Sequence, residues 1–366
     1  MRPLAARRRS AWMWTSASVV LALQACGDPI VVLGDLPGIM RVVLGVAADQ
    51  DAASGPPATR VELAGPRGVA ASSDGTLYVL DPPVRTLFEV STAGQVRTVF
   101  DREGCDGTAC VARPEAVSLD GRGNALLADP SAGRVWQVDL ATGSVTVLAG
   151  QPGGEEARPG AVATTVALLE PAGVAAAPDG SVYFTERNAH RIWRVERDGT
   201  LSAVAGNSLG YLDGPAANAR FRTPAGLALL GSTLFVADQG NHRVRAVHLE
   251  NGTVSTVAGS GTPSYGGDEG LALDASLTSP AAVAVSADGI SLFVADKGNH
   301  RVRRVNLATG IITTFVGTGV GEFTGSGLEA GVTGLAAPSG VAVMSASFLF
   351  VADTDNGLVW RTPVGF

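Results

Sequence analysis

Three of the four histidines in the chain stand at one repeated position and could in principle bind zinc. His190, His242 and His300 each follow an acidic residue by four positions in similar segments, and three imidazoles with an open fourth position form catalytic zinc sites. Equivalent positions in a ring of repeats lie apart, however. We therefore expect each of these turn histidines to bond backbone, and the isolated His248 to lie at the surface.

An acidic residue ends the second apolar run of each of six repeats. Six inward-facing carboxylates could hold a cation, whereas an aspartate before a glycine or asparagine turn normally accepts N–H bonds from that turn. Because every copy carries the acid, we predict a structural role. The six residues are Asp81, Asp129, Glu186, Asp238, Asp296 and Asp353.

A second repeated position lies seven residues after each acid. It holds an aromatic residue in four copies and arginine in two, which predicts packing between neighbouring sheets, with the arginine stems covering the same surface. The residues are Phe88, Trp136, Trp193, Arg245, Arg303 and Trp360.

The elements that carry these residues recur along the chain. The string FVADQGNHRV at 235–244 returns as FVADKGNHRV at 293–302, and four weaker copies end at the other acids. A proline precedes each copy, and these prolines recur every 48 to 58 residues at Pro66, Pro114, Pro171, Pro224, Pro280 and Pro338. Periods of this size with several short strands indicate a propeller or a solenoid.

The strand pattern and the chain ends favour a closed ring. In the fifth copy, strands are predicted at 283–286, 292–296, 302–306 and 311–316, joined by tight turns. The sixth copy ends after three strands, and residues 41–45 match the missing fourth strand. We predict an all-β, six-bladed β-propeller of four-stranded antiparallel blades, closed by the N-terminal strand that completes the last blade. The repeats lie near 66–101, 114–150, 171–206, 224–259, 280–317 and 338–366 plus 41–45.

The fourth and fifth copies resemble the NHL-repeat family through the motif Ala-Asp-x-Gly-Asn-His-Arg-Val. The resemblance covers residues 40–366 and implies a six-bladed propeller, although the first and second copies depart from the motif most. Six-bladed relatives that act as lactonases hold calcium with several carboxylate or amide ligands, and amidating lyases use three convergent histidines. The sequence offers neither ligand set.

The first strand of each repeat would line the channel of such a ring. Its alternate positions hold only small residues, so we predict a channel wall of Gly68, Ala70, Ala116, Ser118, Gly173, Ala175, Gly226, Ala228, Ala282, Ala284, Gly340 and Ala342. The residues after the prolines are Arg67, Glu115, Ala172, Ala225, Ala281 and Ser339. One base and one acid form no cluster of ligands, and we predict no catalytic residue, metal or cofactor.

The N-terminus has the features of an export signal. Three arginines precede an uncharged apolar run that is too short to span a bilayer comfortably as a helix. The run ends in Leu-Gln-Ala-Cys-Gly, which resembles a bacterial lipobox, so residues 1–25 are predicted to be a lipoprotein signal peptide and 26–39 a tether lipidated at Cys26. Gly27 after this cysteine implies sorting to the outer membrane. An ordinary secretory signal is the alternative.

The two remaining cysteines, Cys105 and Cys110, lie in a turn-rich segment. Their spacing permits a disulfide, which an oxidising envelope favours, and a metal pair is the alternative.

Composition restricts the partner. The 366 residues carry a net charge of −7, with 46% hydrophobic residues, which indicates a folded protein and argues against nucleic acid. We predict a lipid-anchored, monomeric binding or scaffolding module of the cell envelope that recognises a protein or glycan. The alternative is a metal-dependent lyase or lactonase of the same fold.

The expected contact residues lie in four long connections, at 151–170, 207–223, 260–279 and 318–337, that begin and end on one face of the ring. The candidates are Tyr211, Asp213, Tyr265, Asp268, Glu269, Phe323 and Glu329. The alternative is that these residues only shape turns.

Overall fold

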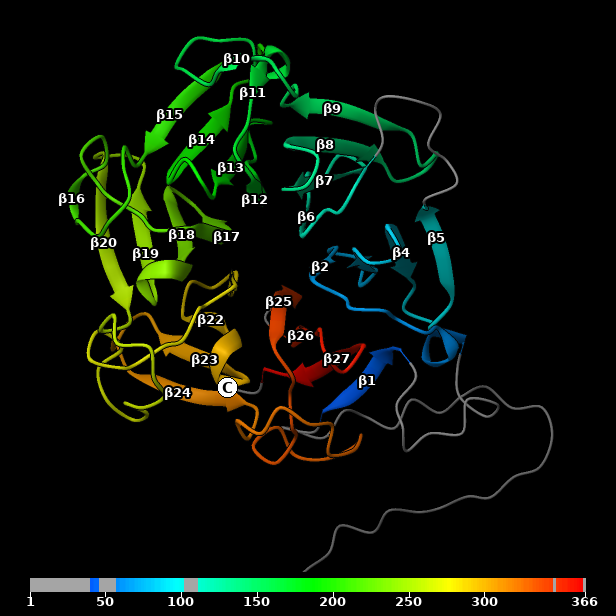
Figure 1. Ribbon diagram of the computed structural model, residues 1–366. Coiled ribbons are helices and arrows are strands. Elements are labelled where there is room, and N and C mark those ends of the chain that lie inside the picture. The colour runs from blue at the N-terminus through cyan, green and yellow to red at the C-terminus, as the bar shows by residue number, and fades with distance from the viewer. Residues whose placement is uncertain (1–39, 46–56, 102–110, 345–346, 365–366) are drawn as a thin grey trace, which may run out of the picture. The chain divides into compact units, whose positions relative to one another are not determined.

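The computed structural model describes residues 40–45, 57–101, 111–344 and 347–364. They belong to one compact unit, Leu36–Phe366, in which six antiparallel sheets surround a central axis (Figure 1). The predicted all-β, six-bladed propeller is therefore confirmed. No helix in the described part of the chain is long and apolar enough to cross a membrane. Cys26, Cys105 and Cys110 lie outside the described residues, so their lipid and disulfide stay predictions.

Each of the first three blades consists of four consecutive strands, numbered outward from the axis. Blade 1 contains β2 (Gly68–Ala71), β3 (Leu77–Asp81), β4 (Thr86–Val90) and β5 (Val96–Phe100). Blade 2 contains β6 (Ala116–Leu119), β7 (Asn124–Asp129), β8 (Arg134–Asp139) and β9 (Val145–Ala149). Blade 3 contains β12 (Pro171–Ala176), β13 (Val182–Glu186), β14 (Arg191–Val195) and β15 (Leu201–Ala205).

The other three blades follow the same plan. Blade 4 contains β17 (Pro224–Leu230), β18 (Thr233–Asp238), β19 (Arg243–His248) and β20 (Thr253–Ala258). Blade 5 contains β21 (Ala282–Val285), β22 (Ser291–Asp296), β23 (Arg301–Asn306) and β24 (Ile312–Val316). Blade 6 contains β25 (Pro338–Met344), β26 (Phe348–Asp353), β27 (Leu358–Pro363) and β1 (Arg41–Leu44). The remaining short elements are η1 (Pro57–Arg60), β10 (Glu155–Glu156), η3 (Ala163–Thr165), β11 (Val166–Ala167), β16 (Gly214–Pro215), η4 (Gln239–Asn241) and η5 (Lys297–Asn299).

The N-terminal strand closes the ring. β1 pairs antiparallel with β27, which places Arg41 opposite Arg361 and Val42 opposite Trp360. The sheet order β1-β27-β26-β25 gives blade 6 the same four strands as the others. The prediction that residues 41–45 complete the last blade is confirmed.

The hydrophobic core is divided among the interfaces between blades. At the interface of blades 4 and 5, Phe235 and Ala237 pack with Leu292 and Val294, all of them buried. Five further clusters each combine side chains from two adjacent blades. Because both faces of every sheet are covered, the strands carry apolar residues on both faces.

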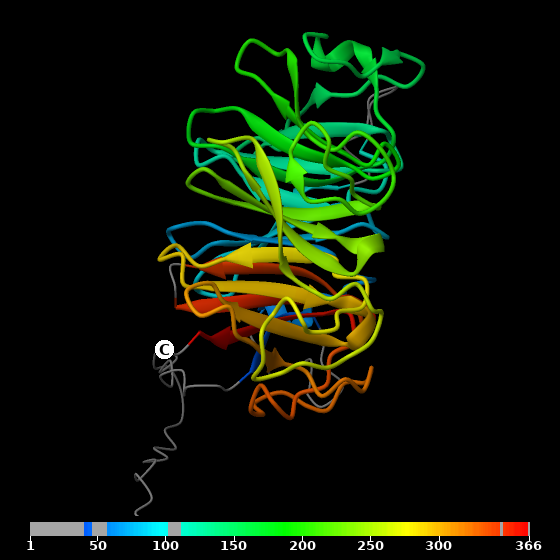
Figure 2. The same cartoon turned by 90° about the vertical axis from the view of Figure 1, so that its left-hand side faces the viewer.

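The four long connections fold along the outer edge of the blade that follows. β16 in the connection before blade 4 pairs with the outer strand β20, and Leu271 forms a bridge to Ile311 beside β24. These connections begin and end on one face of the ring. Their middle parts run along its circumference, as the edge view in Figure 2 shows. They satisfy backbone groups that an exposed edge strand would leave unpaired.

Candidate functional site

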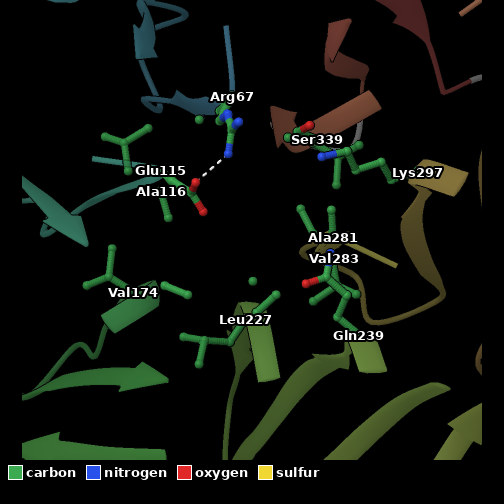
Figure 3. Close-up of a pocket in the computed structure, with 18 of the residues that line it drawn as sticks. Arg67, Glu115, Ala116, Val174, Leu227, Gln239, Ala281, Val283, Lys297 and Ser339 are labelled. Atoms are coloured by element: carbon green, nitrogen blue, oxygen red, sulfur yellow. Dashed lines mark hydrogen bonds and ion pairs between the residues drawn. The ribbon is translucent and has the colours of Figure 1, made fainter. Parts of the chain in front are cut away.

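A cavity of about 360 Å³ opens at one end of the channel, and all six blades contribute to its wall (Figure 3). One repeated position of the innermost strands supplies a branched aliphatic side chain from every blade. These six residues are Val69, Val117, Val174, Leu227, Val283 and Val341. They form the apolar part of the cavity wall.

The predicted wall of small residues is therefore incomplete. Five of the predicted residues do line the cavity, but together with the branched ones: Gly68, Ala116, Gly226, Ala282 and Gly340. The glycines of the innermost strands lie where neighbouring strands approach each other most closely. A Cβ on Gly340 would stand 2.0 Å from the carbonyl oxygen of Arg67, and one on Gly173 would stand 2.3 Å from that of Ala225. Small residues are required there by the adjacent blade, and the branched residues of the intervening position reach the cavity.

The polar rim of the cavity comes from two other positions of the repeat. The residue after each proline supplies Arg67, Glu115 and Ser339, and the residue after each strand-ending acid supplies Arg187, Gln239 and Lys297. Both positions lie at the face where first strands begin and second strands end. The lining thus contains three cationic side chains and one carboxylate.

Glu115 bridges two of these cations. Arg67 of blade 1 donates to one carboxylate oxygen, and Nη2 of Arg187 of blade 3 donates to the other at 2.8 Å. Burial raises the pKa of Glu115, but the charges of Arg187, Arg67 and Lys297 outweigh it and hold the pKa below its usual value. The glutamate is therefore ionised at neutral pH and joins three blades across the mouth.

Lys297 is the third cation of the mouth. It begins η5 and extends toward Ser339 at the border of the cavity (Figure 3). Burial and the nearby Arg67 lower the pKa of its amine, while Glu115 and Asp355 act in the opposite direction. None of the described residues accepts a hydrogen bond from its Nζ.

The strand-ending acids are structural, as predicted, but most of their donors are not in the following turn. Each is buried and accepts a backbone N–H from the segment before its blade, as Asp353 does from Ala336 at 2.6 Å. The residue seven positions later adds a side-chain donor in five blades: Trp360 Nε1 lies 2.8 Å from Asp353, and Arg245 Nη1 lies 2.9 Å from Asp238. These acids connect strands and cannot converge on a cation.

The three repeated histidines connect adjacent blades, and the prediction that they bond backbone is confirmed. Nδ1 of His190, His242 and His300 accepts an N–H from the next blade's approach segment at 3.3, 3.1 and 3.0 Å, from Thr223, Ser279 and Ala337 respectively. In the part of the chain that the structure describes, no three metal-ligating side chains lie together.

Most of the predicted loop contacts have partners within the protein. Nε of Arg245 donates to Asp213 at 3.0 Å, and its guanidinium lies 4.8 Å from the centre of the Tyr211 ring. The connection before blade 5 repeats this arrangement with Asp268 and Tyr265 around Arg303.

The three other loop candidates lie elsewhere. Phe323 stacks on Trp360, with ring centres 5.8 Å apart. Glu269 and Glu329 are exposed. The structure distributes the seven residues over three blades, and their part in recognition stays a prediction.

No family model matches the chain. Over 276 residues it is 28% identical to Protein SUPPRESSOR OF QUENCHING 1, chloroplastic, from Arabidopsis thaliana, which covers 70% of this chain and 26% of that protein. It is 30% identical over 194 residues to human NHL repeat-containing protein 2, covering 46% of this chain and 26% of the human protein. The chain is an NHL-repeat β-propeller. It spans about a quarter of the length of both relatives.

Solved structures share the fold of this NHL-repeat propeller at low sequence identity. An auxiliary nutrient binding protein from Bacteroides thetaiotaomicron has a TM-score of 0.64 and 14% identity, covering 88% of this chain and 75% of that one. A gluconolactonase from Xanthomonas campestris has a TM-score of 0.57 and 17% identity, covering 82% and 86%. The fold thus occurs in both binding proteins and enzymes.

Sequence reasoning gave two mouth residues of the NHL-repeat propeller no role. Arg187 and Lys297 occupy the position after the strand-ending acid, where the otherwise similar fourth copy has Gln239. The available signals were the variation at this position between copies and the presence of a single lysine in the chain.

Proposed function

We propose that this NHL-repeat propeller is a binding module of the bacterial cell envelope that takes the carboxylate of a glycan or protein partner into the mouth of its channel. The observation that carries the proposal is the charge of the lining, where Arg67, Arg187 and Lys297 outnumber Glu115. Guanidinium groups bind carboxylates through parallel hydrogen bonds, and a concave site strengthens the attraction.

The size of the cavity supports entry of a single acidic group. Its volume of about 360 Å³ lies at the small end of the range for ligand pockets, which is roughly 300–1,000 Å³. The branched aliphatic ring below the cations would contact the non-polar side of a ligand. A sugar acid at the end of a glycan, or one acidic side chain of a protein, has this combination of charge and size.

The long connections contribute to the proposal by framing the same face. Tyr211, Asp213, Tyr265 and Asp268 hold the middle parts of two of them against their own blades. The exposed carboxylates of Glu269 and Glu329 are the loop groups left for direct contact with a partner.

Binding of glucuronate and of neutral glucose, measured by calorimetry, tests the proposal. Glucuronate is expected to bind and glucose is not. Arg187→Gln should weaken glucuronate binding about tenfold or more, because hydrogen bonds to charged groups contribute about 1.5–3 kcal/mol. Arg158→Gln is the matched control, since Arg158 is exposed and forms an ion pair with Glu155 in the connection before blade 3.

Two results would contradict the binding proposal. One is equal affinity for the acid and the neutral sugar, and the other is an unchanged affinity in Arg187→Gln with an unchanged melting temperature. Near-stoichiometric zinc or calcium, found by elemental analysis of protein purified without chelator, would instead favour the metal-dependent lyase or lactonase.

The envelope location rests on Cys26 and is tested separately. Acyl chains on this cysteine would hold the propeller at the outer membrane. Cys26→Ser should move the protein from the membrane fraction to the soluble fraction, and continued membrane association of the variant would contradict the anchor.

A further inference from the structure

Lys297 is the only lysine in a chain that carries 27 lysine and arginine residues. The mouth is therefore the single place where the protein offers a side-chain amine. At the equivalent positions, blade 4 has Gln239 and blade 3 has Arg187. An arginine would supply the same charge, but a guanidinium stays protonated and is a poor nucleophile, whereas a lysine amine becomes nucleophilic when it loses its proton.

The surroundings of Lys297 favour the neutral amine. The side chain is half-buried at the wall of the cavity, and the lining also contains Arg67 and Arg187. Burial and these cations lower the pKa of the amine, and the acidic groups that oppose the shift are Glu115 and Asp355. Glu115 is already bonded to both arginines, which leaves Nζ without an ion pair to it.

We propose that the mouth captures small carboxylic acids that carry an aldehyde or ketone next to the carboxylate, by forming an imine with Lys297. The proposal rests on the carboxylate-binding function above and names the class of ligand. Arg67 and Arg187 hold the carboxylate, which places the adjacent carbonyl carbon near the amine. The apolar ring formed by the innermost strands covers the rest of the ligand.

The reaction needs no oxidant or metal. The lone pair of Nζ attacks the carbonyl carbon, and the carbonyl oxygen takes a proton to give a carbinolamine. Loss of water then forms the C=N bond, and both hydrogens of the neutral amine leave with the oxygen. The step is reversible, so the protein binds the acid covalently without consuming it.

Reductive trapping with glyoxylate and cyanoborohydride tests the inference on the full-length protein. Reduction converts the imine to a stable secondary amine, so the peptide that contains Lys297 should gain one carboxymethyl group in mass spectrometry. Labelling should be about tenfold or more faster than that of Nα-acetyl-lysine amide at the same pH, because the free amine is more abundant and the carboxylate is held nearby.

Matched variants separate the parts of the mechanism. Lys297→Arg keeps the charge and should abolish labelling of this peptide. Gln239→Lys in the wild-type background adds a second lysine at the same repeat position, farther from Arg67 in blade order, and should be labelled more slowly. Propionaldehyde lacks a carboxylate, so its rate advantage at Lys297 over the free amino acid derivative should be smaller than that of glyoxylate.

The outcomes distinguish this inference from the proposed function. Labelling of Lys297 at the rate of the free derivative would overturn imine capture, even if glucuronate still binds in the calorimeter. Absence of both binding and labelling would overturn the proposed function as well. Fast labelling that is equal for glyoxylate and propionaldehyde would overturn the role of the carboxylate.

Discussion

Blades 1 and 4 bury an aspartate at the same repeat position, but the two carboxylates have different partners. Asp238 of blade 4 accepts from Arg245 at 2.9 Å, from Asn241 at 2.8 Å and from the backbone N–H of Arg222 at 2.8 Å. Asp81 of blade 1 accepts from the N–H of Ala64 at 2.7 Å, and no described residue donates to its other oxygen.

The difference comes from the residue seven positions after the acid. It is Arg245 in blade 4 and Phe88 in blade 1, and phenylalanine has no donor. Both blades keep the bond from the segment before the first strand, so this bond is the common requirement of the repeat. Arginine or tryptophan on the third strand supplies a second donor. This donor determines how much the buried acid contributes to the stability of its blade.

Removal of Arg245 should have the largest effect. Arg245→Met leaves both Asp238 and Asp213 without their cation, and breaking a buried ion pair costs about 3–5 kcal/mol. The free energy of unfolding, measured with urea, should fall by this amount. Phe88→Leu in blade 1, a change between apolar residues, should cost less than about 1.5 kcal/mol.

Equal losses in the two variants would show that the blades do not differ at this position. Arg245→Trp is a further control, since tryptophan donates to the acid in blades 2, 3 and 6. It should recover part of the loss in Arg245→Met.

The buried acids should also make stability depend on pH, as Asp353 of blade 6 illustrates. Burial raises its pKa from 3.8 to about 6, despite the bonds from Trp360 and Asn356. The folded protein therefore holds a proton that the unfolded chain releases near pH 4, so the contribution of Asp353 to stability is greatest below that pH and falls as pH rises to about 6. The expected decrease is about 1–3 kcal/mol.

Asp353→Asn should flatten this part of the pH profile in urea denaturation. Asp198→Asn is the control, because Asp198 lies in a turn where bonds from Thr200 lower its pKa. This control should leave the profile between pH 4 and pH 6 unchanged. A profile for Asp353→Asn that still falls by the wild-type amount would contradict the assignment.

The features that follow from local repetition could be predicted from the sequence. Contacts between segments that are distant in the sequence could not. Blade order, strand positions and the closing strand all follow from the period and the turns. The donor to Asp81 is the N–H of Ala64, 17 residues earlier in the chain, and no local rule for an aspartate before a turn includes it. The grouping of Arg67 and Glu115 with Arg187 was missed for the same reason, because the three residues come from three blades.

The other error concerned the innermost strands, whose side chains alternate between small and branched residues. Alternation correctly separated small from branched residues, as with Gly340 and Val341, but it did not say which set faces the next blade. The close approach of Gly340 to the carbonyl oxygen of Arg67 assigns the small residues to that interface. The distance between the innermost strands of adjacent blades depends on the diameter of the ring, which the sequence of one repeat does not predict.

The substitution Phe88→Trp should give blade 1 the side-chain donor to its buried acid that the other blades have. A tryptophan there would place Nε1 near Asp81, as Trp193 does for Glu186 at 2.6 Å. Satisfying a buried acceptor is worth about 1 kcal/mol, so the free energy of unfolding should rise by about this amount. In an Asp81→Leu background, which has no acceptor, the same substitution should give no gain. Destabilisation in both backgrounds would indicate that the larger ring does not fit.

The histidine position gives the smallest expected difference between the blades. His242 of blade 4 and Arg85 of blade 1 both have left-handed backbone conformations, with φ of 55° and 56°, but only the histidine accepts an N–H from the next blade. Asparagine tolerates this conformation, so His242→Asn should cost about 1 kcal/mol. Arg85→Asn, at an exposed position, should change stability by less than about 0.5 kcal/mol.

The pH dependence of His242→Asn provides a second readout of the same bond. Burial lowers the pKa of His242 below 6.5, and only the neutral ring can accept through Nδ1. The contribution of the histidine is therefore present above pH 6.5 and is lost as pH falls through the folded-state pKa. The difference between wild type and His242→Asn should shrink in acid, while that of Arg85→Asn stays constant. A difference that is independent of pH would mean that the ring acts by packing and not through its nitrogen.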